Sequence, residues 1–259
     1  MSSNLKFYSN VRNVIVTSLS LASAFILYFI GYAGGKRDCQ NGSAFPPDWK
    51  NDLTYQKPYH VDTFPTISAV VFVLLLIPLW AWKSPCMSKY CSKSNKSYSD
   101  WNDYLKFVFV VAVFYLVGAG ISNGIVDILK GQLCSLRPYA ALKPDEDDSY
   151  LSTPSGHTNI VVYTSVYVTY WLLKEFSDPI IKVGICMLMS VYPFVVGASR
   201  IIDNHHWPAD VLAGAIIGCT VGWTVCYIIE NLDCGKSVTR NSIITNDKDE
   251  EPAFSPQDA

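Results

Sequence analysis

The stretch LKFVFVVAVFYLVGAGISNGIV, residues 105–126, is almost entirely apolar and holds only one charged residue, Lys106. About 20 mostly apolar residues are enough for a helix to cross the hydrocarbon core of a bilayer. Five other windows approach or meet this length, so the sequence predicts an all-α, polytopic membrane protein with about six transmembrane helices. The six windows are residues 14–35, 65–82, 105–126, 157–173, 179–198 and 209–229.

The composition supports this fold class. Half of the residues are hydrophobic and 16% are charged, whereas soluble domains average about 25% charged residues. A net charge of -2 provides no broad basic field, so we do not expect nucleic acid as a partner. The eight cysteines include no CxxC pair and no Cys/His ligand spacing, so we expect no metal and no cofactor. The bilayer is the expected partner, and a homo-oligomer is left open.

The chain is expected to form one six-span domain over residues 1–232, followed by a polar cytoplasmic tail over residues 233–259 with the composition of a disordered segment. An even number of spans places both termini on one side of the membrane. A modest excess of Lys and Arg near these ends indicates that this side is cytoplasmic. Window 157–173 is the least apolar, because hydroxyl groups and tyrosines interrupt its aliphatic residues, and we expect it to face other helices.

With this topology, three polar clusters lie together on the non-cytoplasmic side. They are KGQLCSLRP (residues 130–138), PSGH (154–157) and SRIIDNHHWPAD (199–210). A phosphoryl group carries its charge on three non-bridging oxygens, which arginine can bind in pairs and lysine as a point charge. A serine hydroxyl and the amides at a helix start can add further donors. The residues predicted to bind phosphate are Lys130, Arg137, Ser155, Gly156 and Arg200.

Two histidines can divide the work of a displacement at phosphorus. Asp210 follows His206 by four residues, one helical turn, so it can accept a hydrogen bond from one ring nitrogen and leave the other unprotonated. We therefore predict that His206 is the nucleophile and that His157 protonates the leaving alkoxide. Taken singly, these residues have simpler interpretations as interfacial anchors, loop residues or helix caps. Their joint occurrence on one side favours the functional interpretation.

The three clusters resemble the signature of the type 2 phosphatidic acid phosphatases, or lipid phosphate phosphatases, of the PAP2 superfamily. That signature reads K-x6-R-P, P-S-G-H and S-R-x5-H-x3-D, and every fixed position is present here with the expected spacing. The resemblance implies a helical PAP2/haloperoxidase-like core, a site facing the lumen or cell exterior, and the same residue roles, with Asp210 orienting His206. It also implies metal-independent hydrolysis, through a phosphohistidine, of phosphatidate, lysophosphatidate, sphingosine phosphate or diacylglycerol pyrophosphate in the plasma membrane or an endomembrane.

The chain departs from the family pattern at several positions. Many animal members have a basic residue and a histidine where this chain has Ser135 and Tyr139, and HHWPAD partly resembles a bacterial form. The signature is shared with haloperoxidases, glucose-6-phosphatases, sphingolipid phosphatases and sphingomyelin synthases. Six spans argue against the first of these, and 259 residues argue against the second. The alternatives are a phosphotransferase acting on a lipid head group and an inactive lipid-binding member, which the complete set of site residues disfavours.

Two further features concern the predicted outer side. Asn41 lies in an Asn-Gly-Ser sequon of the first outer loop and is a glycosylation candidate, whereas Asn95 lies in a predicted cytoplasmic loop and should carry no sugar. Cys39 and Cys134 are the cysteines expected in the oxidising compartment. A disulfide between them is open from sequence alone.

Overall fold

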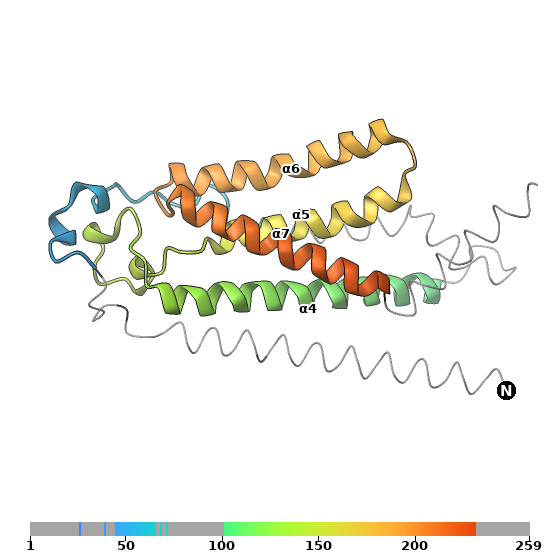
Figure 1. The fold of residues 1–259 in the computed structure, drawn as a ribbon, viewed down its shortest axis with the longest axis horizontal. Helices are drawn as coiled ribbons and strands as arrows, with labels where there is room; N and C mark the ends of the chain where they lie inside the picture. Colours follow the sequence, from blue (N-terminus) through green and yellow to red (C-terminus); the bar gives the residue numbers. More distant parts are fainter. Residues whose placement is uncertain are drawn as a thin grey trace, which may run out of the picture.

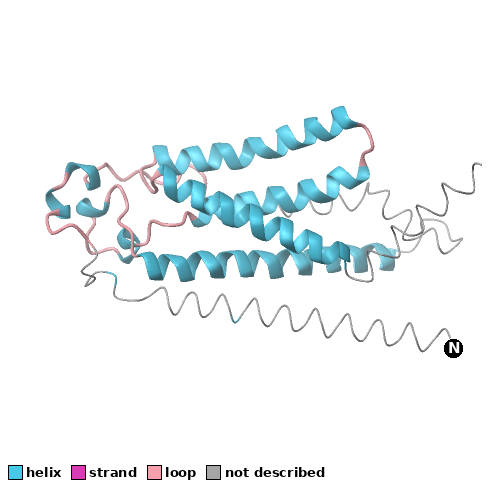
Figure 2. Cartoon of the chain, viewed as in Figure 1, coloured by secondary structure: helices cyan, strands magenta, loops and turns pink. Residues whose placement is uncertain are grey.

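The structure is a computed structural model of the 259-residue chain, and it describes residues 26, 39, 45–65, 68, 71 and 101–231. Every regular element within these residues is a helix (Figure 2). The predicted spans at 14–35 and 65–82 fall almost entirely outside the described residues, as do Asn41, Asn95 and the tail over 233–259. The all-helical class is therefore confirmed for the described part, while six spans stay a prediction.

Four long helices run side by side as a bundle (Figure 1). The connection between the first two of them, the turn between the last two, and residues 45–65 all lie at one end of this bundle. We call this the outer end. The helices are α4 (Trp101–Leu133), α5 (Gly156–Glu175), α6 (Pro179–Ile202) and α7 (Pro208–Asn231).

Helix α5 contacts α4, α6 and α7. Its polar side chains find partners between the helices: the Thr164 and Tyr115 hydroxyls lie 2.7 Å apart, and the Tyr163 hydroxyl donates to the Tyr115 carbonyl at 2.9 Å. Such bonds remove the cost of burying a hydroxyl away from water. The expectation that window 157–173 faces other helices is confirmed.

Helices α5 and α7 approach closely because α7 presents glycines to α5. A Cβ atom at Gly214 would collide with the Ser155 carbonyl, and one at Gly218 would collide with the Asn159 carbonyl. Small residues at a helix contact allow the two backbones to come together. This contact holds the first turn of α5 against the first turns of α7.

Three segments are long and apolar enough to cross a membrane: Ala112–Leu133 in α4, Pro179–Ile202 in α6 and Pro208–Ile228 in α7. Large apolar side chains point outward, among them Leu188 and Phe194 of α6, which are 72% and 77% exposed. Lipid is the solvent that suits such a surface. Helix α5 is not among these candidate spans, because its tyrosines and hydroxyl residues lower its hydropathy. The predicted fourth span is therefore present as a helix but is not apolar enough to count as a candidate span.

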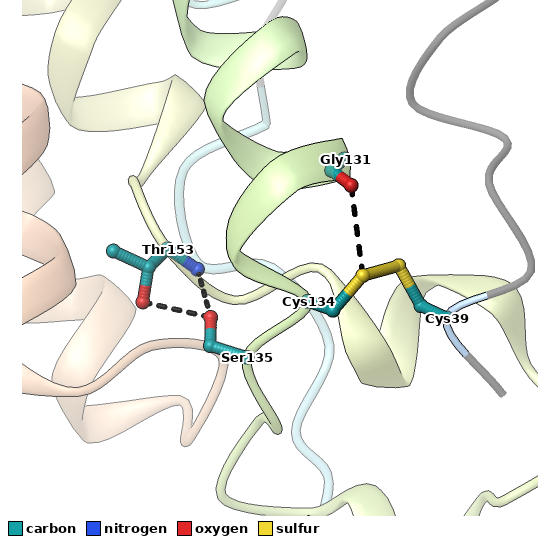
Figure 3. The surroundings of a disulfide bond; sticks show 5 residues. All are labelled: Cys39, Gly131, Cys134, Ser135 and Thr153. Carbon is teal, nitrogen blue, oxygen red and sulfur yellow. Dashed lines mark hydrogen bonds between the residues drawn. A yellow bond between two sulfur atoms is a disulfide. The ribbon is translucent and has the colours of Figure 1, made fainter. Parts of the chain in front are cut away.

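A small lobe covers the outer end. It contains the short helices η2 (Trp49–Asn51), η3 (Leu53–Tyr55), η4 (Ala140–Leu142) and η5 (Asp147–Tyr150). Trp49, Leu136, Ala140 and Tyr150 form its buried cluster, together with Cys39. A disulfide joins Cys39 to Cys134, so the pairing that the sequence left open is present in the structure (Figure 3).

Candidate active site

All eight residues predicted to bind phosphate or to act in catalysis lie at the outer end of the bundle. Lys130 is in the last turn of α4, Arg137 follows that helix, Arg200 is in the last turn of α6, and His206 precedes α7. The remaining four are Ser155, Gly156, His157 and Asp210 at the starts of α5 and α7. The packing of α5 on α7 brings the second and third clusters together, since the Ser155 amide donates to the Asp210 carbonyl at 3.0 Å.

His206 has one ring nitrogen committed to a hydrogen bond. Its Nδ1 lies 2.8 Å from the Ser152 carbonyl oxygen. A carbonyl only accepts, so Nδ1 must carry the proton, and the neutral ring then has its lone pair on Nε2. The side chain is 3% exposed, and burial lowers the pKa of His206 to about 4, with Arg137 and Lys130 acting in the same direction. At neutral pH the imidazole is therefore uncharged, as a nucleophile requires.

Asp210 lies close to His206 but is not its nearest acceptor. Nδ1 of His206 is 3.8 Å from Oδ2 of Asp210, beyond hydrogen-bond distance, because the Ser152 carbonyl occupies the acceptor position. The carboxylate instead accepts from the Ser152 hydroxyl at 2.5 Å, the Trp207 amide at 2.9 Å and the Thr153 hydroxyl. The link from Asp210 to His206 thus runs partly through Ser152, which sequence reasoning missed because any residue has a carbonyl.

The spacing of Trp207, Pro208 and Asp210 also has a structural role. Proline is favoured at the first helical position, and an acidic side chain three residues after the cap can accept from the cap amide. Asp210 makes this bond to Trp207, so it secures the start of α7 as well as the surroundings of His206. Asp210 can therefore serve both as a cap of α7 and in the proposed orientation of His206.

The start of α5 has the predicted cap. The Ser155 side chain accepts from the Thr158 amide at 3.5 Å, which leaves the earlier amides of the helix for another acceptor. A Cβ atom at Gly156 would meet only Val126 and the Lys130 ammonium, each at 3.9 Å. The Lys130 ammonium therefore lies over the first turn of α5, beside these amides.

Arg137 and Arg200 are buried, and their guanidinium groups are only partly satisfied. Nη1 of Arg200 lies 2.7 Å from Asp62 and its Nη2 lies 3.2 Å from Asp203, while Nη1 of Arg137 lies 3.4 Å from Nδ1 of His205. The Nε of each arginine is buried without a hydrogen-bond partner among the described residues. A buried N–H group without an acceptor is costly, so both Nε atoms suit an anionic ligand.

Two residues at the site, His205 and Asp62, were not singled out from sequence. His205 lies between the arginines, since its Nε2 is 3.1 Å from the Asp62 carboxylate that binds Arg200. Tyr139, one of the departures from the family pattern, is buried against the His205 ring at a centroid distance of 5.7 Å. His205 directly precedes the motif histidine, and Asp62 lies three residues before the second predicted span. No local pattern marks either residue.

Ser135, the other position that departs from the family pattern, is linked to Asp210 through Thr153. Its hydroxyl accepts from the Thr153 amide at 2.7 Å and bonds to the Thr153 hydroxyl at 2.8 Å, next to the disulfide (Figure 3). Thr153 in turn donates to Asp210.

Within the described residues, no group of three His, Cys, Asp or Glu side chains has the arrangement of a metal site. Independence from metal stays a prediction.

Comparison with known proteins places these residues in a family context. The PAP2 superfamily matches residues 110–233, a range that includes every predicted phosphate-binding and catalytic residue and excludes residues 45–65. Phospholipid phosphatase 2 of Rattus norvegicus is 27% identical over 160 residues, covering 51% of this chain and 58% of that protein. The Homo sapiens protein of the same name is 27% identical over 161 residues, covering 51% and 56%.

A third relative covers more of the chain. Phospholipid phosphatase 1 of Rattus norvegicus is 27% identical over 212 residues, which is 69% of this chain and 73% of that protein. The chain therefore spans somewhat more than half the length of the first two relatives and about three quarters of the third. No solved structure matches this chain.

Proposed function

We propose that this chain, whose residues 110–233 match the PAP2 superfamily, hydrolyses phosphate monoesters of lipids through a phosphohistidine intermediate on His206. One observation carries the proposal. Two buried arginines each hold an Nε without a partner among the described residues, and beside them lies a buried imidazole whose Nδ1 proton is held by a carbonyl. Donors that can bind an anion, placed next to a neutral nitrogen nucleophile, are the groups that phosphoryl transfer requires.

In the first half of the reaction, Arg137, Arg200 and Lys130 bind the non-bridging oxygens of the substrate phosphate. Nε2 of His206 attacks phosphorus as the bond from phosphorus to the lipid oxygen breaks. His157 gives its proton to that oxygen, so the lipid leaves as an alcohol. The phosphorylated imidazole is positively charged, and the Ser152 carbonyl and the Asp210 carboxylate lie on its Nδ1 side to stabilise it.

In the second half, water attacks the phosphohistidine. His157, now neutral, takes a proton from this water, the bond from phosphorus to Nε2 breaks, and inorganic phosphate leaves. Each group returns to its starting state. The three cations neutralise the charge on the transferring phosphoryl group, a task that magnesium performs in many other phosphoryl-transfer enzymes. We therefore expect turnover without added metal.

The lipid substrate and the orientation of the site are supported by the surroundings. The site lies at the end of helices that include three candidate spans, and the similar proteins are named phospholipid phosphatases. Disulfides persist in oxidising compartments. The bond between Cys39 and Cys134 lies at the same end as the site, which supports a site that faces the lumen or cell exterior.

The test is a phosphate-release assay on the purified full chain in detergent micelles. The substrates are phosphatidate, lysophosphatidate, sphingosine phosphate and diacylglycerol pyrophosphate, each with and without EDTA, and a His206→Ala protein is the blank. We expect at least one lipid to release phosphate at a rate that EDTA leaves unchanged. Release from none of them, or activity that EDTA abolishes and magnesium restores, would contradict the proposal.

A further inference from the structure

Residues 45–65 lie outside the range that matches the superfamily, yet they are fastened to the site. The Thr63 amide and hydroxyl donate to the Asp203 carboxylate at 3.0 and 2.8 Å, and the Lys57 amide donates to the Pro138 carbonyl at 3.0 Å. The disulfide at Cys39 ties the chain before this segment to the end of α4. These anchors join residues that lie 81 to 140 positions apart in the sequence.

Asp62 is the residue of this segment that lies against the site. Its Oδ1 is 2.7 Å from Nη1 of Arg200 and 3.1 Å from Nε2 of His205, and its Oδ2 is 3.7 Å from Nε2 of His157. One carboxylate thus contacts the phosphate-binding arginine of α6 and the proposed acid of α5.

The contact with Arg200 fixes the direction of its guanidinium group. Asp62 binds Nη1 and Asp203 binds Nη2, so two of the three nitrogens are held by carboxylates on separate segments. A planar guanidinium held at both Nη atoms cannot rotate freely. Its buried Nε then keeps a defined direction, as a preorganised phosphate donor must.

The contact with His157 concerns charge. Burial, together with the cations Arg200, Lys130 and Arg137, lowers the pKa of His157 to about 4. Asp62 is the carboxylate that acts in the opposite direction. An acid that donates to a leaving group has to hold its proton until the bond breaks, so this opposing charge suits the role of His157.

We propose that Asp62 is a positioning residue of the active site, which holds the Arg200 guanidinium in its binding orientation and raises the proton affinity of His157, the proposed donor to the leaving group. The inference rests on the proposed function for its roles, but the contacts themselves come from a segment that the superfamily match does not include. Asp62 touches neither the phosphorus nor the lipid oxygen in this scheme. It acts through the two residues that do.

The test compares Asp62→Asn, Asp62→Glu and Asp52→Asn in the full chain. Asp62→Asn removes the charge but retains an oxygen that can accept from Arg200. Asp52 is a matched control, because it is an exposed carboxylate of the same segment whose side chain accepts from the Thr54 amide, a bond that asparagine also makes. Glutamate at position 62 restores the charge.

We expect Asp62→Asn to move the basic limb of the kcat/KM profile about one pH unit lower, since an opposite charge within about 4–6 Å favours the charged form by at least that amount. Above that limb, kcat/KM falls about tenfold, while KM does not rise. In Asp62→Glu the basic limb should lie close to the pH found for the unmodified chain, and in Asp52→Asn it should lie at the same pH. A purely structural role for Asp62 would lower activity without moving the limb.

A second measurement does not depend on turnover. The four histidine rings are labelled, the His157 signal is assigned with a His157→Gln protein, and its titration is followed by NMR. Asp62→Asn should lower the His157 midpoint by about one unit. An unchanged midpoint together with an unchanged limb would overturn the proposal. Absence of phosphate release from the unmodified chain would instead overturn the proposed function, and the titration would still decide whether Asp62 stabilises the protonated ring.

Discussion

At the scale of single residues, the distribution of protons and charges at the outer end explains why each side chain has its own task. His206 and His205 are neighbours in sequence with different partners. The Ser152 carbonyl holds the Nδ1 proton of His206, whereas Nδ1 of His205 faces an arginine that can only donate. His205 therefore carries its proton on Nε2, towards the His60 carbonyl at 2.7 Å. It links the outer segment to Arg137, while Nε2 of His206 is the atom proposed to attack phosphorus.

Arg200 should be the most sensitive of the phosphate-binding residues, because it is 1% exposed and carries one of the two Nε donors without a partner. Arg200→Ala is expected to lower kcat/KM about a hundred- to a thousandfold, the typical effect of removing one preorganised donor. Arg200→Lys retains the charge but not the planar donor set, so it should recover only part of the loss. Steady-state kinetics on both proteins measure this, and full activity in Arg200→Lys would contradict the role of Nε.

The pH dependence of turnover should reflect the buried state of His206. Protonation of Nε2 blocks attack, and burial lowers the pKa of His206 to about 4, so the acid limb of kcat/KM should lie near that pH. The unfolded chain holds this proton up to about pH 6.5. His206 therefore destabilises the fold as the pH drops from about 6.5 to about 4. Rates and thermal midpoints measured over this range check both effects, and an acid limb at or above pH 6.5 would contradict them.

At the scale of helices, the contact between α5 and α7 sets the distance between the second and third clusters. Gly214→Ala forces a Cβ atom into the Ser155 carbonyl, so we expect a loss of about 1–3 kcal/mol in stability and a drop in activity. Gly184→Ala in α6 is the matched control, since a Cβ there meets no atom of the described residues within 4 Å. It should leave the thermal midpoint and kcat unchanged or slightly raised. Equal behaviour of the two proteins would show that the close contact does not position the site.

The helices and the signature residues were predictable from sequence, because both depend on local patterns. Apolar windows predicted α4, α6 and α7, and the spacing around Arg137, His157 and His206 identified the residues that converge. Asp62 escaped prediction because its contact with Arg200 joins positions 138 residues apart, and no periodicity encodes such a contact. Ser152 escaped because its backbone carbonyl, which every residue has, makes the bond to His206.

At the scale of the whole molecule, the bundle combines an apolar outside with a polar end. Exposed apolar side chains along α6 suit lipid, while the buried charged side chains of the candidate site lie at the outer end. Under the proposed function, a lipid would keep its chains in the bilayer while its head group reaches Arg137 and Arg200. Buried charges near a membrane are costly unless they are paired, which is consistent with a functional role for these residues.

The proposed sidedness gives a prediction for the chain in cells. Asn41 follows the disulfide-bonded Cys39 by two residues and should be glycosylated when the chain is expressed in a eukaryotic cell, whereas Asn95 should remain bare. Treatment with a glycosidase followed by mass spectrometry of the two peptides distinguishes them. An Asn41→Gln protein is the control for the mobility shift. Sugar on Asn95 would contradict the proposed sidedness, because it would place the loop that contains Asn95 outside the cytoplasm and the site on the cytoplasmic side.

The central claim is that His206 forms a covalent bond to phosphorus. The most direct measurement is rapid quenching of turnover with a substrate labelled in its phosphate, followed by peptide mapping under alkaline conditions that preserve phosphohistidine. We predict label on His206, label retained in a His205→Ala protein with measurable turnover, and no label in His206→Ala. Label on His157, or full activity in His206→Ala, would contradict the account.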